Sequence, residues 1–305
     1  MNAPSGEQIE IALGAQRAVV VEVGAALRSY SVAGVELLDG FGPDEMSHSG
    51  RGQVLIPWPN RVEQGSYEFG GERHQLALNE PERGNAIHGL VRWVGWTAAE
   101  REPHRVVMEH QLRPQPGYPF SLALAVEYTL AEDGLRVRTT ATNIGPDPCP
   151  FGSGAHPYLR AGPATVDEVV LTLPASTVLR ANENGIPIGS APVDGTAHDF
   201  REPRAIGDTV LDHAFTDLER GDDGIARVQL RDAAGGGLDL WVDQSYPYLM
   251  VFTGDPLPDV NRRSLAVEPM TCPPNALRTG EAVVTLQPGE ALTGTWGITP
   301  LAAAA

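Results

Sequence analysis

Apolar and polar positions alternate over short runs along most of this 305-residue chain. Runs such as LALAVEYTL and LRVRTTAT place an apolar or β-branched residue at about every second position, which is the spacing of a strand with one buried face. Further runs of this kind are RAVVVEV, EVVLTL, LDLWVD, LMVFTG, SLAVEP and AVVTLQ. Runs with the 3.6-residue period of an amphipathic helix are nearly absent. The pattern therefore predicts an all-β protein.

Turn residues separate these runs and predict short connections between antiparallel strands. Gly70 and Gly71 stand between YEF and ERHQLAL, a spacing typical of a two-residue hairpin whose turn needs positive φ. The segments AEDG, AAGGG and PGE precede later strand runs in the same way. The 34 glycines and 26 prolines fit a fold with many turns.

Two longer stretches interrupt the strand pattern. One runs from about Ala181 to Asp208, and the other runs from Asp255 to Thr279 around the single strand run SLAVEP. Long loops in a compact β protein are usually functional or disordered. No charge run, low-complexity linker or internal repeat divides the chain. We therefore predict one domain over residues 1–305, a large antiparallel β-sandwich whose long loops border one face.

The composition restricts which partners the chain can bind. Hydrophobic residues make up 42% of it and charged residues 20%, as in folded globular proteins. The formal net charge is −17, whereas phosphate backbones and anionic membranes are bound through Lys and Arg. We therefore expect neither nucleic acid nor a membrane as a partner. The same field repels anionic small molecules at long range, although a local basic pocket could overcome it.

The terminal and cysteine features favour the cytoplasm. The first residues, MNAPSGEQIEIALG, lack the basic and apolar regions of a signal peptide, and no apolar run is long enough to cross a bilayer. Cys149 and Cys272 each precede a proline. Two cysteines do not make a disulfide framework in a chain of this length, so we expect buried, reduced thiols.

Two early segments place polar residues among apolar ones. IPWPNRVEQ contains Asn60 and Arg61, and its two prolines stiffen the approach to a guanidinium that suits oxygen-rich ligands. An ordinary loop arginine bound to carbonyls is the alternative. GNAIHGLVRWVGW contains His88, for which a structural role is equally open, and also Trp93 and Trp96. Indole faces pack well on sugars, but we expect both tryptophans in the core.

Two later segments supply groups that can move protons. In FGSGAHPYLR, small residues precede His156 and a proline and an aromatic follow it, which predicts an imidazole at the end of a strand facing a cavity. In SLAVEPMTCPPNAL, Glu268 is expected to end a hydrophobic strand, where partial desolvation would raise the pKa of its carboxyl. Taken alone, each residue could equally be structural.

Motifs of several other enzyme classes are missing from the sequence. The eight histidines and two cysteines contain no H-x-H, H-E-x-x-H or C-x-x-C pair, which argues against a zinc site. There is no G-x-S-x-G, no P-loop and no G-x-G-x-x-G after a strand. Hydrolase, kinase and dehydrogenase hypotheses therefore lose support.

In this order, the segments PNR, HG, HPY and EP resemble the aldose 1-epimerases, also called mutarotases. The similarity extends over most of the chain and includes PNRVEQGSYEFGGERHQL and LDHAFTDL. The resemblance implies a single-domain β-supersandwich with a sugar cleft across one sheet. It also implies catalysis without a cofactor or metal. We expect a small-molecule sugar as the partner and a monomer or homodimer.

The resemblance also implies roles for individual residues. His156 matches the family's general acid and Glu268 its general base, so the reaction would interconvert the α and β anomers of a hexose by ring opening and reclosure. The residues that match the sugar-holding positions or line the same cleft are Asn60, Arg61, His88, Asp212 and Tyr158.

Two segments depart from the galactose mutarotase pattern and leave the sugar open. GLVRWVGW follows His88 where a glycine-rich continuation is usual, and FGSGAHPYLR lacks the asparagine of the more polar version. A hexose 6-phosphate or another anionic sugar is one alternative substrate, with Arg83 and Arg92 as candidate anion ligands. A non-catalytic carbohydrate-binding β-sandwich is another alternative, which would not need the pair of His156 and Glu268.

Overall fold

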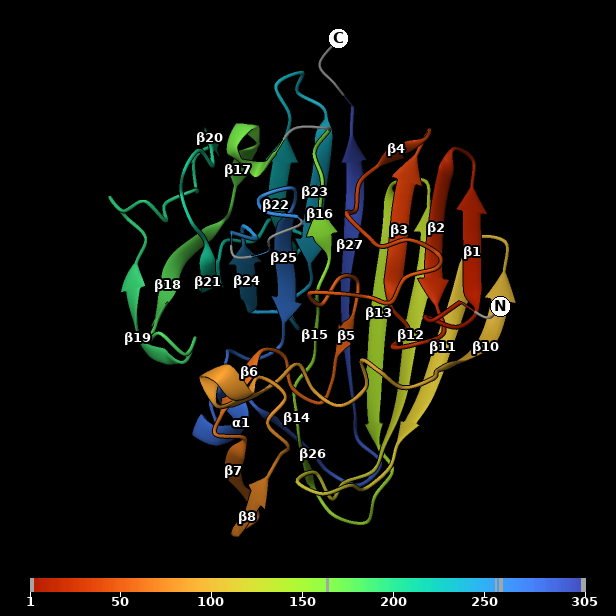
Figure 1. Cartoon of the computed structure of the whole chain (residues 1–305), viewed down its shortest axis with the longest axis vertical. Helices are drawn as coiled ribbons and strands as arrows, with labels where there is room; N and C mark the ends of the chain where they lie inside the picture. The colour runs from red at the N-terminus through yellow and green to blue at the C-terminus, as the bar shows by residue number, and fades with distance from the viewer. Residues whose placement is uncertain (1–2, 163–164, 256, 258–259, 303–305) are drawn as a thin grey trace.

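The computed structural model describes residues 3–162, 165–255, 257 and 260–302 and shows two large antiparallel sheets packed on each other (Figure 1). The ends of the predicted domain, residues 1–2 and 303–305, lie outside the described residues, as do positions 256, 258 and 259 of the second long loop. Among the described residues no helix is long and apolar enough to cross a membrane. Cys149 and Cys272 are buried free thiols, as predicted.

The larger sheet has nine strands that lie in the order β10-β11-β12-β13-β27-β23-β22-β17-β20. Their bounds are β10 Thr97–Glu102, β11 Arg105–Leu112, β12 Leu122–Ala131, β13 Gly134–Asn143, β27 Ala291–Leu301, β23 Gly237–Val242, β22 Ala226–Arg231, β17 Val170–Thr172 and β20 Arg204–Ala205. The central strands alternate between buried and half-buried positions, because one face packs on the core and the other meets solvent.

The second sheet has eight strands in the order β19-β18-β21-β24-β25-β15-β5, with β16 also paired to β25. Their bounds are β19 Pro187–Pro192, β18 Ala175–Ala181, β21 Asp212–Leu218, β24 Tyr248–Phe252, β25 Leu265–Met270, β15 Gly154–Ala155, β5 Val54–Leu55 and β16 Tyr158–Leu159. Its central strand β25 is buried on both faces. One face of β25 packs on the core, so the opposite face must be covered by other parts of the chain.

Smaller elements complete the sandwich. A four-stranded sheet of β1 Gln8–Leu13, β2 Gln16–Val21, β3 Leu27–Val32 and β4 Val35–Glu36 lies against β11 and β12 (Figure 1). Three strand pairs are β6 Arg61–Glu63 with β9 Asn85–Ile87, β7 Ser66–Phe69 with β8 Glu72–Gln75, and β14 Cys149–Phe151 with β26 Val284–Leu286. The described helices are short: η1 Pro81–Arg83, η2 Val166–Glu168 and α1 Ala276–Thr279.

One hydrophobic cluster runs between the sheets from Ile9 near the start of the chain to Ile298 near its end. It takes alternate residues from the nine-stranded sheet, such as Val126, and from the eight-stranded sheet, such as Val267. The predicted antiparallel β-sandwich is confirmed. The hairpin at Gly70 and Gly71 is also confirmed, with φ of 62° and 83° in the turn between β7 and β8.

Two expectations about local structure are wrong. The stretch from Ala181 to Asp208 is not irregular throughout, because it contains β19, which pairs with β18, and β20, which pairs with β17. Its Pro and Gly residues are tolerated since β19 and β20 are edge strands. Glu268 does not end its strand, because β25 continues through Pro269 to Met270.

Candidate active site

Glu268 lies in the middle of the eight-stranded sheet, on the face turned away from the main core. Antiparallel pairing places it opposite Met250 of β24, and Phe252 of the same strand lies opposite Asp212 of β21. Because side chains alternate along a strand, these four residues share one face. Asp212 and Glu268 therefore project into the same space, although 56 positions separate them in the sequence.

His156 reaches this space from the short connection between β15 and β16. Both strands are two residues long and pair with β25, so the backbone on either side of the imidazole is held by the sheet. The Nε2 atom of His156 lies 3.3 Å from Oε1 of Glu268. The predicted position after a strand and facing a cavity is confirmed, and the two residues that the resemblance pairs are in contact.

Asn60 and His88 are joined by two hydrogen bonds at the end of the β6–β9 pair, where Asn60 precedes β6 and His88 follows β9. The His88 N–H donates to the Asn60 carbonyl at 2.9 Å, and the Asn60 N–H donates to Nδ1 of His88 at 3.2 Å. Both residues have positive φ, 54° and 63°. Because Nδ1 of His88 accepts a hydrogen bond, its proton belongs on Nε2. The His88 ring meets the His156 ring edge to face, with centroids 5.3 Å apart.

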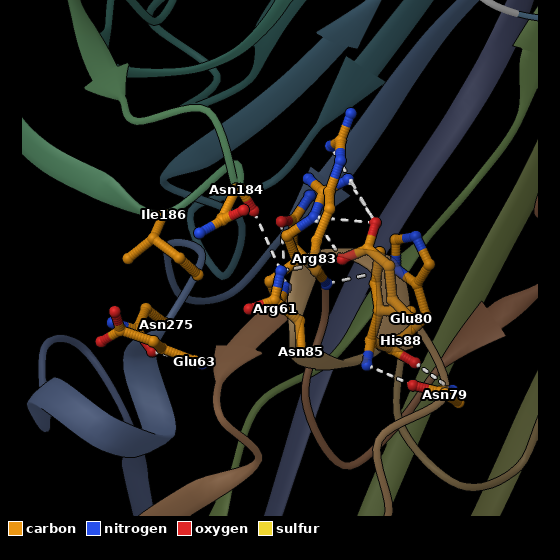
Figure 2. Close-up of polar contacts among 12 residues, drawn as sticks. Arg61, Glu63, Asn79, Glu80, Arg83, Asn85, His88, Asn184, Ile186 and Asn275 are labelled. Atoms are coloured by element: carbon orange, nitrogen blue, oxygen red, sulfur yellow. Dashed lines mark hydrogen bonds and ion pairs between the residues drawn. The ribbon is translucent and has the colours of Figure 1, made fainter.

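Arg61 is fixed by a carboxylate that the sequence analysis did not single out. Its Nε lies 2.9 Å from Oε2 of Glu80, and its Nη2 lies 2.9 Å from Oε1, so the pair is bidentate (Figure 2). Asn85 donates from Nδ2 to Oε2 of Glu80 at 2.8 Å. Gly185 approaches from another loop, where a Cβ would lie 2.7 Å from Nη1 of Arg61. The arginine is therefore not an ordinary carbonyl-binding loop residue.

The seven predicted site residues all line one cleft of about 660 Å³. They are Asn60, Arg61, His88, His156, Tyr158, Asp212 and Glu268. The structure adds further lining residues that the sequence did not reveal as part of the site, including Glu80, Met250 and Phe252. No local motif marks these three, since they reach the cleft only through strand pairing and loop packing.

The two tryptophans of the second segment differ in position. Trp96 is 3% exposed and belongs to the core, as expected. Trp93 is 53% exposed and lines the cleft, so the expectation that it is a core residue is wrong. The sequence could not separate them because both follow the same apolar run. An exposed indole beside a polar cleft offers a face on which a sugar ring can stack.

Burial has opposite effects on the acid and the base. Burial lowers the pKa of the His156 imidazole to about 3, and the positive charges of Arg92 and Arg51 act in the same direction. Burial raises the pKa of the Glu268 carboxyl well above its usual value, and the nearby Asp212 carboxylate adds to this. The burial of both groups therefore favours a neutral imidazole next to a carboxylic acid, with one proton shared between two groups in contact.

Two polar atoms of this pair lack hydrogen-bond partners in the described part of the chain. Nδ1 of His156 and Oε2 of Glu268 are buried and form no hydrogen bond with the described residues. Buried polar atoms normally have a partner, and exceptions often mark a functional site. The two unpaired atoms therefore mark this pair as a candidate functional site.

Arg92 brings a positive charge to the cleft, and no carboxylate of the described residues forms an ion pair with it. Its Nη1 donates to Oε1 of Gln53 at 3.2 Å and its Nη2 donates to the Ile87 carbonyl at 3.3 Å, while Nε has no partner among the described residues. Burial lowers the pKa of this guanidinium to about 10. Arg83, the other candidate, is 35% exposed and lies 4.0 Å from Glu80.

His88, His156 and Glu268 also have the donor types of a metal site, each with one ligand atom within 4.8 Å of the others. The hydrogen bond from Asn60 to Nδ1 of His88 keeps the proton on Nε2, and a metal at Nε2 would have to displace that proton. Catalysis without a metal, which the resemblance implies, stays a prediction.

Comparison with known proteins agrees with this geometry. The family model described as aldose 1-epimerase matches residues 7–299. The chain belongs to the aldose 1-epimerase family. Enzymes of this family are isomerases that act on carbohydrates, and the all-β architecture described above agrees with this assignment.

Relatives of this aldose 1-epimerase include both uncharacterised and named proteins. The uncharacterised protein YihR of Escherichia coli K12 is 36% identical over 287 residues, which cover 94% of this chain and 91% of that protein. Human galactose mutarotase is 33% identical over 171 residues, which cover 53% of this chain and 48% of that enzyme.

Solved structures show that this aldose 1-epimerase shares its fold with distant relatives. The aldose epimerase homologue of C. elegans superimposes with a TM-score of 0.86 at 20% identity, covering 97% of this chain and 99% of the other. A putative aldose 1-epimerase of Escherichia coli K12 superimposes with a TM-score of 0.82 at 19% identity, covering 96% and 98%.

Proposed function

We propose that this enzyme interconverts the α and β anomers of a hexose, with Glu268 and His156 as the acid–base pair. The observation that carries the proposal is the 3.3 Å contact between the two buried groups, both of which belong to residues that line the cleft. Mutarotation needs one group that removes the proton of the anomeric hydroxyl and one that protonates the ring oxygen. A pair that shares one proton can do both.

The residue roles follow the resemblance. Glu268 takes the proton from the anomeric hydroxyl, the bond between C1 and the ring oxygen breaks, and His156 delivers a proton to that oxygen. Rotation about C1–C2 and reclosure on the other face return both protons. The resting pair is neutral, so its proton must first pass from Glu268 to His156, and their contact provides the path. Arg61, His88, Asn60, Tyr158 and Asp212 line the cleft where the hydroxyls would be held.

Anomer exchange can be measured directly by polarimetry or by NMR exchange spectroscopy on α-glucose and α-galactose. Each correctly placed proton transfer typically contributes about 10² to 10⁴ in rate, so His156→Ala should lose activity on this scale. Wild-type protein that binds sugar without exchanging anomers would support a carbohydrate-binding module instead. Full activity in His156→Ala would remove the imidazole from the mechanism.

A second candidate substrate class is favoured by Arg92. A half-buried guanidinium that has no carboxylate within ion-pair distance among the described residues is a costly feature, and an anionic substituent on the sugar would balance it. Arg61 cannot serve in the same way because Glu80 already neutralises it. The candidate reaction is 1-epimerisation of a hexose that carries a phosphate, sulfonate or other anionic group.

The two substrate classes are separated by comparing exchange on glucose, glucose 6-phosphate and a glucose 6-sulfonate. If the anion binds at Arg92, Arg92→Gln raises KM for the anionic sugar by about 10- to 100-fold, the usual range for a lost charged hydrogen bond. Exchange on glucose should change far less. An equal effect on all three sugars would assign Arg92 to the packing of the cleft.

A further inference from the structure

Three aromatic and cationic groups form a stack that begins outside the cleft and ends at the acid–base pair. The guanidinium carbon of Arg51 lies 4.2 Å from the centre of the Tyr158 ring. The His156 imidazole is stacked on the same tyrosine, with ring centroids 4.9 Å apart and an interplanar angle of 11°. The Tyr158 ring is thus in contact with both the imidazole and the guanidinium.

Arg51 is held at the outer end of the stack by a buried ion pair. It is only 1% exposed, and its Nη2 lies 3.1 Å from Oδ2 of Asp39. The same carboxylate accepts hydrogen bonds from Nε of Arg263 at 3.0 Å and from the hydroxyl of Ser264 at 2.8 Å. Burying an arginine costs free energy unless its charge is paired. The ion pair with Asp39 is therefore needed to keep Arg51 in this position.

The backbone next to Arg51 holds the main chain of His156 as well. The Gly52 N–H donates to the His156 carbonyl at 3.0 Å, and the His156 N–H donates to the Gln53 carbonyl at 3.1 Å. Gly50 lies against the ring itself, since a Cβ there would be 2.5 Å from Cδ2 of His156. The imidazole is therefore enclosed on one face by Tyr158, at one edge by Gly50 and at Nε2 by Glu268.

We propose that Arg51 is a positioning residue for His156: anchored by Asp39, it fixes the orientation of the Tyr158 ring, and the stacked Tyr158 ring keeps the imidazole turned toward Glu268. Arg51 itself is not one of the residues that line the cleft in which a sugar would bind. Its effect on the reaction passes through Tyr158. The inference rests on the proposed acid–base role of His156.

The positive charge of Arg51 has a second, separable effect on the same pair. The charged and titratable groups that face His156 are Arg51, Arg61, Arg92, His88, Tyr158, Glu268 and, beyond it, Asp212. A nearby positive charge disfavours every additional proton on the pair. Removing it must therefore move both limbs of the pH profile of kcat/KM to higher pH.

Two substitutions separate the charge from the flat stacking surface. Arg51→Lys keeps the charge but loses the planar guanidinium, so kcat should fall about 10- to 100-fold through misplacement of the imidazole, with the pH limbs unmoved. Arg51→Met removes both, so a similar fall in kcat should come with a shift of roughly 0.3 to 1 pH unit in both limbs. Asp39 keeps Arg263 and Ser264 as partners in either variant.

Arg220→Met provides the matched control for the loss of a partly buried arginine. Arg220 donates to the carbonyls of Gly224, Val242 and Tyr246 and lies outside the cleft. This variant should lose thermal stability while keeping the wild-type kcat and pH limbs. KM should change less than kcat in both Arg51 variants, because Arg51 contacts only Tyr158 among the proposed sugar-binding residues and leaves Asn60, Arg61, His88 and Asp212 unchanged.

Titration of His156 by NMR tests the proposal independently of turnover. In Arg51→Met the imidazole should titrate at higher pH than in wild type, whether or not the protein exchanges anomers. Wild-type kcat in folded Arg51→Lys would overturn the positioning role. If Arg51→Met does not fold, the kcat of Arg51→Lys alone decides whether Arg51 has a positioning role. Wild-type protein without anomer exchange would instead refute the proposed function, and the NMR shift would still report on the stack.

Discussion

Strands β12 and β25 occupy central places in the two large sheets, yet they differ in what covers them. β12 alternates between buried and half-buried residues over its ten positions, because its outer face meets solvent. All six residues of β25 are buried, because the main core covers one face and the cleft residues cover the other. The contrast shows where the site lies. On the outer face of β25, polar side chains of the cleft take the place that solvent has on the outer face of β12.

The same residue type behaves differently on the two strands. Glu127 of β12 lies on the solvent face and pairs with Arg105. Glu268 of β25 is 2% exposed, has one oxygen without a partner among the described residues, and has a raised pKa. A carboxyl group is suited to proton transfer when removal of water and of neighbouring cations raises its pKa. Glu127 on β12 keeps both the solvent and the cation Arg105.

The largest expected effect comes from the same substitution on both strands. Glu268→Gln removes the proton carrier with little change in shape, so anomer exchange should fall by about 10² to 10⁴. Glu127→Gln is the matched control, and it should leave exchange unchanged and alter stability by at most about 0.5 kcal/mol. Polarimetry and thermal unfolding of both proteins check this. Equal activity of the two variants would contradict the assignment of Glu268.

The next largest effect falls on stability and leaves the chemistry intact. Leu124 lies on the buried face of β12, and Leu124→Ala should lower the free energy of unfolding by about 2–5 kcal/mol. Because Leu124 is remote from the cleft lining, kcat of the remaining folded protein should stay at its wild-type value. Urea denaturation and exchange assays at low temperature measure the two quantities. A loss of kcat without loss of stability would show coupling between the sheets.

A smaller effect is expected where the cleft wall holds Arg61. Glu80→Gln removes the bidentate carboxylate partner and frees the guanidinium, so KM should rise by about tenfold, the equivalent of one charged hydrogen bond. The exposed pair of Arg227 and Asp223 supplies the control. Asp223→Asn should leave KM unaltered, and unaltered KM in Glu80→Gln as well would show that Arg61 needs no fixed orientation.

The smallest effect concerns the pH dependence of stability. The folded-state pKa of Glu268 is raised, so its contribution to stability is fully present below the unfolded-state value and is lost as pH rises through the folded-state pKa. Glutamine does not ionise, so Glu268→Gln should gain stability relative to wild type as pH increases. Melting temperatures at several pH values measure this. A difference that is constant with pH would mean that Glu268 stays protonated throughout.

The sequence contained most of the information about β12 and less about β25. Strict alternation predicted β12 and the sandwich, since a half-solvated strand has a period of two. A run of buried residues has no such signature, so Glu268 was expected at a strand end, whereas the strand continues past it. The pairing of His156 with Glu268 came from the family resemblance, because no local spacing connects residues so far apart.

Sequence patterns could not predict which residues contact the site residues and hold them in place. Glu80 reaches Arg61, and Arg51 reaches Tyr158, through folding of loops that have no periodicity. Trp93 and Trp96 follow one apolar run, but a turn between them sends one indole outward. The predicted extent of the domain, the cytoplasmic location, the oligomeric state and the absence of a cofactor stay predictions.

The exposed indole of Trp93 also makes the cleft optically visible. Of the five tryptophans in the chain, Trp58, Trp96 and Trp296 are at most 3% exposed, and Trp241 is half-buried. Fluorescence that is accessible to iodide or acrylamide should therefore come mainly from Trp93. A sugar stacked on that indole would shield it from the quencher, so the intrinsic emission of the unlabelled protein can report occupancy of the cleft even in variants that no longer turn over.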